Sequence, residues 1–367
     1  MRAERTANMD SGNDLKKDPF EEYLRETEPS KRESIYYWQT AIGLQAVDGL
    51  ETSDYLKETA KNNIEGTISI SKAQELIESY YQENPKTGDD RTEEADKVAA
   101  RIAAILSENA FTFSSTQYLS IHKRLFEGIY SHAGRIRDYN ITKKEWVLDG
   151  DTVMYGGASE LRPTLEYDLS QERDFSYAGL TMQEVIRHLA RFVSRLWQIH
   201  VFGEGNTRTT AVFFIKYLRS LGFNVTNDIF AKNAWYFRNS MVRANYNNLQ
   251  KNVHETTEYL ETFLRNLLLG EQNELHNRTM HISGSFQADA KLHDPINDPI
   301  NDPIKLTVRE QQLLQLLRES PELTRRELAG KLGCSDSTVK RELQILSEQG
   351  ILRRIGSRKT GVWVINR

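Results

Sequence analysis

A polar elbow between two amphipathic helical patterns decides how this chain folds. Residues 181–218 read TMQEVIRHLARFVSRLWQIHVFGEGNTRTTAVFFIKYL. Apolar residues recur at steps of three and four on both sides of HVFGEGNT, so the pattern predicts two helices that each bury one face. Gly203 and Gly205 fall in the elbow between them, where they permit backbone angles that larger residues resist and let a ligand approach the main chain.

The start of the second helix is predicted to bind an anion. Asn206 is a favourable N-cap residue. The free N–H groups of the helix start and the positive end of its dipole then face the elbow, and Arg208 adds a full charge in the first turn. Phosphate is the anion that we expect there.

His200 and Glu204 lie beside this predicted anion site. An imidazole can take a proton from a hydroxyl at neutral pH, and a carboxylate next to bound phosphate can hold Mg²⁺. Together they supply the parts of a phosphoryl or nucleotidyl transfer site. Each also has an ordinary alternative, since a histidine can simply pair with a helix C-terminus and Gly-Glu-Gly-Asn can be a plain turn.

Familiar nucleotide-binding motifs are absent from the sequence. The elbow lacks the third glycine of a dinucleotide fingerprint and follows a helix pattern rather than a strand. The chain also contains no GxxxxGK[ST] loop. A nucleotide site in this protein must therefore be of another kind.

Composition limits the class of protein. The chain has 367 residues, of which 38% are hydrophobic and 27% charged, and its mean hydropathy is −0.61. No apolar run approaches the ~20 residues of a membrane span, and the start lacks the apolar stretch of a secretory signal. A single cysteine, Cys334, cannot form a disulfide within the chain or a thiolate metal site. We expect a cytoplasmic protein that does not enter a membrane.

Five regions are predicted along the chain. They are a mobile tail at 1–34, an N-terminal helical region at 35–110, a domain that carries the elbow at 111–270, a linker at 271–305 and a small domain at 306–367. Helical periods and the scarcity of proline predict a mainly α body. The linker repeats Asp-Pro-Ile-Asn from Asp294 onward, which favours an extended spacer.

One segment of the body is β-prone. Residues 140–148 and 152–155 flank an Asp149-Gly150 turn signal, so a hairpin is predicted over 141–155. An isolated two-stranded ribbon is marginal in water, so it would gain order by packing on helices or by pairing with another chain. An irregular surface loop is the alternative.

The C-terminal domain is basic. From Lys305 to Arg367 the chain has 13 Lys or Arg against seven Asp or Glu, a balance of +6 that leaves −10 for the rest of the −4 total. Helices are predicted over 307–319, 324–333 and 337–349, followed by two β-prone segments. This order resembles the winged-helix family.

The winged-helix resemblance implies contact with DNA. In such folds the third helix enters the major groove and the wing touches phosphate. By that resemblance the contacts would come from Ser337, Thr338, Lys340, Arg341, Arg358 and Lys359. Winged helices attached to enzymes also bind proteins or dimerise, so a protein partner or a homodimer is the alternative.

The elbow itself resembles the signature of Fic-domain proteins. His200-x-Phe202-x-Glu204-Gly205-Asn206-x-Arg208 is similar to His-Pro-Phe-x-[Asp/Glu]-Gly-Asn-Gly-Arg-x-x-Arg, and the likeness extends over about residues 111–269. The resemblance implies a Fic-type helical domain with a β-hairpin flap. It also implies an enzyme, a nucleotidyltransferase that moves AMP from ATP to a hydroxyl of a target protein, and the flap would pair with the target backbone.

The resemblance also implies a role for each elbow residue. His200 would deprotonate the target hydroxyl, Glu204 would hold Mg²⁺, and Phe202 would anchor the elbow in the core. The residues around the nucleotide phosphates would be Gly203, Gly205, Asn206, Thr207 and Arg208. Tyr236 is a candidate wall for adenine, with a position in the core as its alternative.

Three departures separate this chain from the Fic signature. Val201 replaces proline, Thr207 replaces a glycine, and Ala211 stands where the second arginine is expected. Residues 61–66, KNNIEG, look like the Ser/Thr-x-x-x-Glu-Gly/Asn element that restrains many Fic proteins. We expect Glu65, followed by Gly66, to enter the site as an inhibitor paired with a cation such as Arg208, or as a base that removes AMP. A surface glutamate is the alternative.

Three functions are open at this stage. The first is a Mg²⁺-dependent protein adenylyltransferase, which could also modify itself. The second is a DNA-binding regulator whose Fic domain has degenerated into a ligand sensor. The third keeps the elbow but transfers UMP, phosphocholine or phosphate, because nothing in the elbow reads the base.

Overall fold

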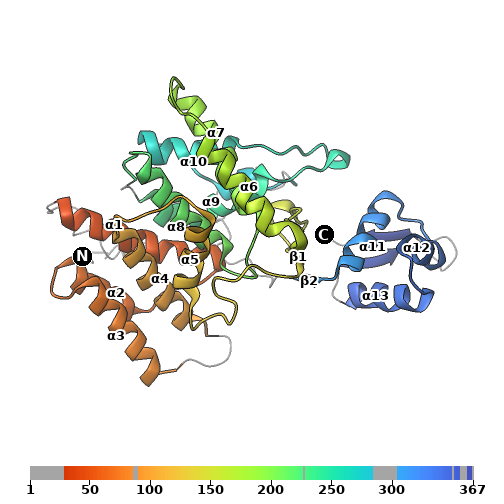
Figure 1. The fold of residues 1–367 in the computed structure, drawn as a ribbon, viewed down its shortest axis with the longest axis horizontal. Coiled ribbons are helices and arrows are strands. Elements are labelled where there is room, and N and C mark those ends of the chain that lie inside the picture. The colour runs from red at the N-terminus through yellow and green to blue at the C-terminus, as the bar shows by residue number, and fades with distance from the viewer. Residues whose placement is uncertain are drawn as a thin grey trace, which may run out of the picture.

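The computed structural model describes residues 29–85, 90–225, 228–283, 304–348, 351–355 and 362–365. Over these ranges the chain forms thirteen α-helices and four short strands, so it is mainly α, as expected. Figure 1 shows a large helical body and a smaller unit, α11–α13, next to the strands β1 and β2.

The N-terminal region contributes four helices to the body. They are α1 (Pro29–Gly43), α2 (Asp54–Ile64), α3 (Ile70–Glu83) and α4 (Thr92–Ser107), and a 3₁₀ turn, η2 (Leu44–Asp48), follows α1 directly. Helix α1 starts at Pro29, so the predicted tail is shorter than 34 residues; residues 1–28 lie outside the described part. Most of α4 is buried, because its alanine-rich faces let α1 and α3 pack closely.

Six further helices complete the body, and α8 among them packs on α4, α5 and α7. The body continues with α5 (Ser115–Phe126), α6 (Leu161–Asp174), α7 (Met182–Ile199), α8 (Asn206–Ser220), α9 (Ile229–Ala244) and α10 (Glu258–Leu269). Every residue of α8 from Asn206 to Leu218 is buried, polar ones included. Short 3₁₀ turns connect them: η3 (Trp146–Leu148), η4 (Ala158–Glu160), η5 (Leu249–Lys251) and η6 (Asn277–Met280).

One hydrophobic core joins the two regions that were predicted as separate. It runs from Ile35 to Met280 and includes residues of both 35–110 and 111–270. The body also extends beyond residue 270, since Met280 is 1% exposed and the Ile282 N–H donates to the Val147 carbonyl at 3.0 Å. The linker therefore starts later than predicted. The repeat that begins at Asp294 lies outside the described residues up to Pro303.

The predicted hairpin over 141–155 does not form a regular pair of strands. Within this segment only β1 (Asn140–Thr142) is a strand. After it, Glu145 and Asp151 form one isolated antiparallel bridge. The Thr142 hydroxyl donates to the Thr152 hydroxyl at 3.0 Å. The partner of β1 is β2 (Ile304–Leu306), antiparallel, with Ile141 opposite Lys305. The predicted hairpin is thus reduced to one antiparallel bridge, and β1 pairs with a segment that is distant in sequence.

The C-terminal unit has the predicted order of elements. It contains α11 (Val308–Glu319), α12 (Arg325–Leu332), α13 (Asp336–Glu348) and the antiparallel strands β3 (Leu352–Ile355) and β4 (Val362–Ile365). Thr307 with Glu310 and Thr324 with Glu327 form capping boxes, and Gly333 ends α12 in the left-handed region at φ 62°. A second core, centred on Leu313, Leu328 and Leu346, belongs to this unit alone.

None of the helices in the described ranges combines the length and apolar character that crossing a membrane would need.

A glycine controls how closely α1 approaches α9. A Cβ on Gly43 would lie 2.3–2.7 Å from backbone atoms of Ala231, so Gly43→Ala forces the two helices apart. We expect it to lower the free energy of unfolding by about 1–3 kcal/mol, measured by urea unfolding. Gly157→Ala is the control, since a Cβ there meets nothing within 4 Å. Equal stability of the two variants would contradict the close packing.

Candidate active site

Two residues in the left-handed backbone region and the side-chain amide of Asn206 shape the elbow. His200 ends α7 at φ 52°, and Gly205 precedes α8 at φ 73°, where a Cβ would lie 2.4 Å from the Phe126 ring. Asn206 is not the N-cap that was predicted. Its side chain accepts from the Phe202 N–H at 3.0 Å and donates to the Phe202 carbonyl at 2.8 Å, so it holds the elbow closed across four residues.

A buried histidine that the sequence did not single out supports the elbow. His122 on α5 stacks on the buried Phe202 ring, with centroids 3.6 Å apart. The Gly134 N–H donates to its Nδ1 at 2.8 Å, so Nε2 carries the proton and donates to the Glu204 carbonyl at 3.0 Å. Burial lowers the pKa of His122 to about 3, which keeps the ring neutral.

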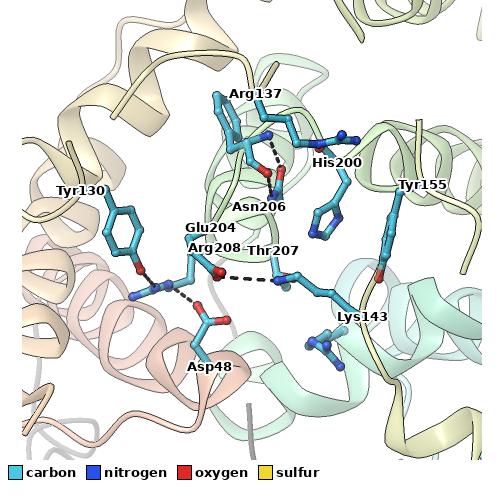
Figure 2. Close-up of polar contacts among 12 residues, drawn as sticks. Asp48, Tyr130, Arg137, Lys143, Tyr155, His200, Glu204, Asn206, Thr207 and Arg208 are labelled. Carbon is cyan, nitrogen blue, oxygen red and sulfur yellow. Dashed lines mark hydrogen bonds and ion pairs between the residues drawn. The ribbon is translucent and has the colours of Figure 1, made fainter. Parts of the chain in front are cut away.

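His200 is buried beside the start of α8. It is 3% exposed and lies 4.3 Å from the Tyr155 ring and 5.3 Å from the Trp197 ring (Figure 2). Neither ring nitrogen has a hydrogen-bond partner within the described part of the chain. A catalytic base must be reachable by the hydroxyl of its substrate, and His200 is not. Because the Tyr155 ring lies against the imidazole, a substrate would reach His200 only after the segment that carries Tyr155 moves.

The charges around His200 keep its imidazole neutral. Burial, then the positive charges of Lys143, Arg137 and Arg238, hold the pKa of His200 well below 6.5. Arg137 also fixes the backbone, because its Nε donates to the His200 carbonyl at 2.7 Å. The neutral ring therefore offers one N–H donor and one acceptor nitrogen, and neither has a hydrogen-bond partner among the described residues.

Glu204 forms an ion pair with Lys143 in this structure. Its Oε2 lies 3.6 Å from Nζ of Lys143, and both side chains are mostly buried. The described residues contain no cluster of three or more metal-ligating side chains. Mg²⁺ commonly uses one or two carboxylates together with substrate phosphates, so this single carboxylate fits the ion once Lys143 withdraws.

Arg208 is fully buried in a network of acidic and polar groups. Its Nε lies 2.6 Å from Oδ2 of Asp48, and its guanidinium donates to the Tyr130 hydroxyl at 3.2 Å (Figure 2). The guanidinium also donates to Glu94 at 2.7 Å and to Gln45 at 3.0 Å. Burial alone would lower the pKa of Arg208, but these neighbours raise it above its ordinary value. The side chain expected to neutralise phosphate is already neutralised by protein carboxylates.

Two family models match this chain. The model of the Fic/DOC family matches residues 112–218, and a model of an HTH domain matches residues 309–362. The chain carries a Fic/DOC domain. The match runs from just before α5 to the end of the buried part of α8, so it includes His122, His200 and the elbow. No curated protein matches the chain.

The carboxylates that pair with Arg208 are Asp48 and Glu94, and not Glu65 as the sequence suggested. Glu65 is exposed at the end of α2, and Gly66 follows it at φ 81°. The carboxylates that pair with Arg208 come from η2 and α4 instead. No local pattern marks Asp48 or Glu94, because each meets Arg208 only through the packing of the N-terminal helices on the Fic domain.

Thr207 and Tyr236, which were predicted to contact the nucleotide, contact other parts of the protein in this structure. The Thr207 hydroxyl accepts from the Trp197 indole at 3.0 Å, which ties α8 to α7. Tyr236 is a core residue, since it is 3% exposed, stacks near Phe263 and donates to the Tyr259 carbonyl at 3.3 Å. The α9 side chain that reaches the site is Arg238, whose ion pair with buried Glu145 measures 2.8 Å.

The predicted DNA contacts lie at the start of α13. Ser337, Lys340 and Arg341 are exposed, and Thr338 is half-buried beside Ser335. Arg358 and Lys359 lie outside the described residues. The described positions form part of the surface that the third helix of an HTH domain presents.

The neutral state of His122 predicts a loss of stability in acid. Its pKa is about 3 when folded and about 6.5 when unfolded, so below pH 6.5 the unfolded chain binds more protons. The free energy of unfolding should fall by about 1.4 kcal/mol per pH unit for this group between pH 6 and 4. Urea unfolding across this range measures it.

His122→Gln tests the assignment. This variant should show a shallower dependence on pH than the wild type, whereas His276→Gln, at an exposed histidine, should not. An unchanged slope in His122→Gln would mean that the proton affinity of His122 does not differ between the folded and unfolded chain.

Proposed function

We propose that this protein is a Fic-type protein adenylyltransferase that moves AMP from ATP to a hydroxyl of a target protein, and that the form described here is restrained. One observation carries the proposal: His200 is a neutral imidazole whose ring nitrogens both lack a partner among the described residues, beside the first turn of a 15-residue helix. The match to the Fic/DOC family supports a transferase of this type.

The chemistry follows from these groups. His200 takes the proton of the target hydroxyl, whose oxygen attacks the α-phosphorus of ATP; the new P–O bond forms as the bond to the β-phosphate oxygen breaks and pyrophosphate leaves. The N–H groups of the first turn of α8 would receive the negative charge of the phosphate. Mg²⁺, when bound, would be held by Glu204 and would offset charge on the phosphate oxygens.

The restraint lies in the pairing of Arg208. Two carboxylates, on Asp48 and Glu94, neutralise the guanidinium and would repel a phosphate that approaches it. Asp48 is on η2 and Glu94 on α4, so a shift of η2 away from α8 would leave Arg208 with one carboxylate instead of two and with a net positive charge that is less fully offset. This assigns the inhibitory role that the sequence suggested for Glu65 to Asp48.

A second function is favoured by the HTH match. That match supports binding of DNA by the C-terminal unit, with the exposed cations of α13 as contacts. Buried Ala211, in place of the second Fic arginine, favours a degenerate Fic domain in a DNA-binding regulator, whereas the intact His200, Glu204 and Arg208 favour the enzyme. Transfer of another group also stays open, since Tyr236 does not offer a wall for adenine.

Label transfer from nucleotides tests the enzyme. The protein is incubated with Mg²⁺, a cell extract and ATP labelled at the α-phosphate. Asp48→Asn should increase labelling by about tenfold or more, equivalent to about 1.4 kcal/mol of barrier, because it removes one of the two carboxylates that neutralise Arg208. Adding His200→Ala should abolish the label. Glu65→Gln, a loss of charge at an exposed site, is the matched control and should resemble the wild type.

Other labels separate the alternatives. If only γ-labelled ATP transfers label, the transferred group is phosphate rather than AMP. If only α-labelled UTP transfers label, the transferred group is UMP. Label that persists when His200→Ala is combined with Asp48→Asn would contradict the role of the base. Thermal unfolding of each variant shows whether a loss of label reflects a loss of fold.

Charge reversal on α13 tests DNA binding. Lys340→Glu with Arg341→Glu should weaken binding of a random 30-base-pair duplex by about tenfold or more and reduce its dependence on salt, because two phosphate contacts are lost. Arg318→Glu, an exposed cation at the end of α11, is the control and should change binding much less. Equal effects would point to a diffuse attraction rather than an interface on α13.

A further inference from the structure

The chain covers the edge of its own strand next to the active site. β1 pairs along its whole length with β2, and the register places Asn140, Ile141 and Thr142 opposite Leu306, Lys305 and Ile304. An uncovered strand edge offers unpaired N–H and C=O groups to any extended peptide. In Figure 1 the two strands lie side by side between the body and the C-terminal unit.

β1 is connected to the active site at both ends. Before it, Arg137 donates to the His200 carbonyl and to the Tyr139 carbonyl. After it, Lys143 forms the ion pair with Glu204. A change in what pairs with β1 therefore acts on the backbone of the base and on the cation that occupies the carboxylate.

β2 is connected just as directly to the C-terminal unit. Leu306 is 5% exposed and belongs to the core of that unit. The next residue, Thr307, accepts from the Glu310 N–H as the cap of α11, and its own N–H donates to the Glu310 carboxylate at 2.7 Å. No flexible residue separates the strand from the HTH domain, so the two move together.

By the Fic resemblance, the edge of β1 is where an extended target peptide would pair. We propose that residues 304–306 are the resident occupant of this edge, an internal competitor that links the HTH unit to the Fic site. The proposal rests on the proposed function and adds a second restraint to that at Arg208. A target strand must displace β2 before it can lie along β1. Movement of the HTH unit is what removes β2.

The energetics suit an exchangeable occupant. A three-residue ladder contributes few hydrogen bonds, and each adds little net stability in water, so β2 alone is held weakly. Its attachment to the same chain gives it an effective concentration of about millimolar, which an unattached peptide at lower concentration does not match. A partner that pairs over more residues can still replace it.

A cysteine pair tests the register without using activity. In a Cys334→Ser background, Thr142→Cys with Ile304→Cys places the two thiols on facing residues. Oxidation of the dilute protein should close an internal disulfide in most molecules, seen by mass spectrometry and on non-reducing gels. Thr142→Cys with Val308→Cys is out of register and should cross-link far less. Equal cross-linking of both pairs would overturn the pairing.

Locking and releasing the strand test the competition. In the Asp48→Asn background, oxidation of the in-register pair should lower label transfer to extract proteins by about tenfold, and reduction should restore it. Ile304→Pro with Lys305→Pro, which removes two N–H donors from β2, should raise transfer and speed hydrogen exchange of the amides of residues 140–142.

The outcomes separate this inference from the proposed function. Label that does not respond to a disulfide shown to be closed overturns the competitor role and leaves the transferase intact. Absence of label from every variant contradicts the transferase and the gating together, while the cross-link and the exchange rates still decide whether β2 covers β1.

Discussion

The buried charge of Arg208 is the constraint on which the rest of the structure depends. A guanidinium without solvent contact is costly unless its donors are satisfied and its charge is paired. No residue of α8 itself provides this, so the partners come from the N-terminal helices, through Asp48 and Glu94. The N-terminal region and the Fic domain share one hydrophobic core, and this packing brings both carboxylates to the guanidinium.

The same network makes the site complete but closed. Three positions that chemistry requires are each covered by protein: Arg208 by carboxylates, Glu204 by Lys143, and His200 by the segment that carries Tyr155. The groups that cover them come from different parts of the chain. In the proposed transferase this form would exclude nucleotide without distorting the elbow, because His122 and Asn206 hold its backbone in place through hydrogen bonds.

The sequence predicted well what neighbouring residues determine. The two helices around the elbow, the buried anchor Phe202 and the capping boxes of the HTH unit depend on contacts within a few residues, and periodicity or cap chemistry reveals them. Contacts with distant partners were not predicted. Arg208 pairs with Asp48 and Glu94 rather than with Glu65, and β1 pairs with β2 rather than with residues 152–155. Tyr236 failed for a related reason, since an aromatic residue at helical spacing is equally suited to a core.

The electrostatics of His200 show why closure and catalysis are compatible. Lys143, Arg137 and Arg238 lower the pKa of the imidazole in the absence of nucleotide, which guarantees a neutral ring but makes it a weak proton acceptor. In the proposed transferase a nucleotide would bring negative charge close to the same three cations, and this charge would offset their effect. The pKa of His200 would then rise towards its ordinary range, where an imidazole accepts a proton efficiently. The cations that attract the phosphates would thus couple the strength of the base to the presence of its substrate.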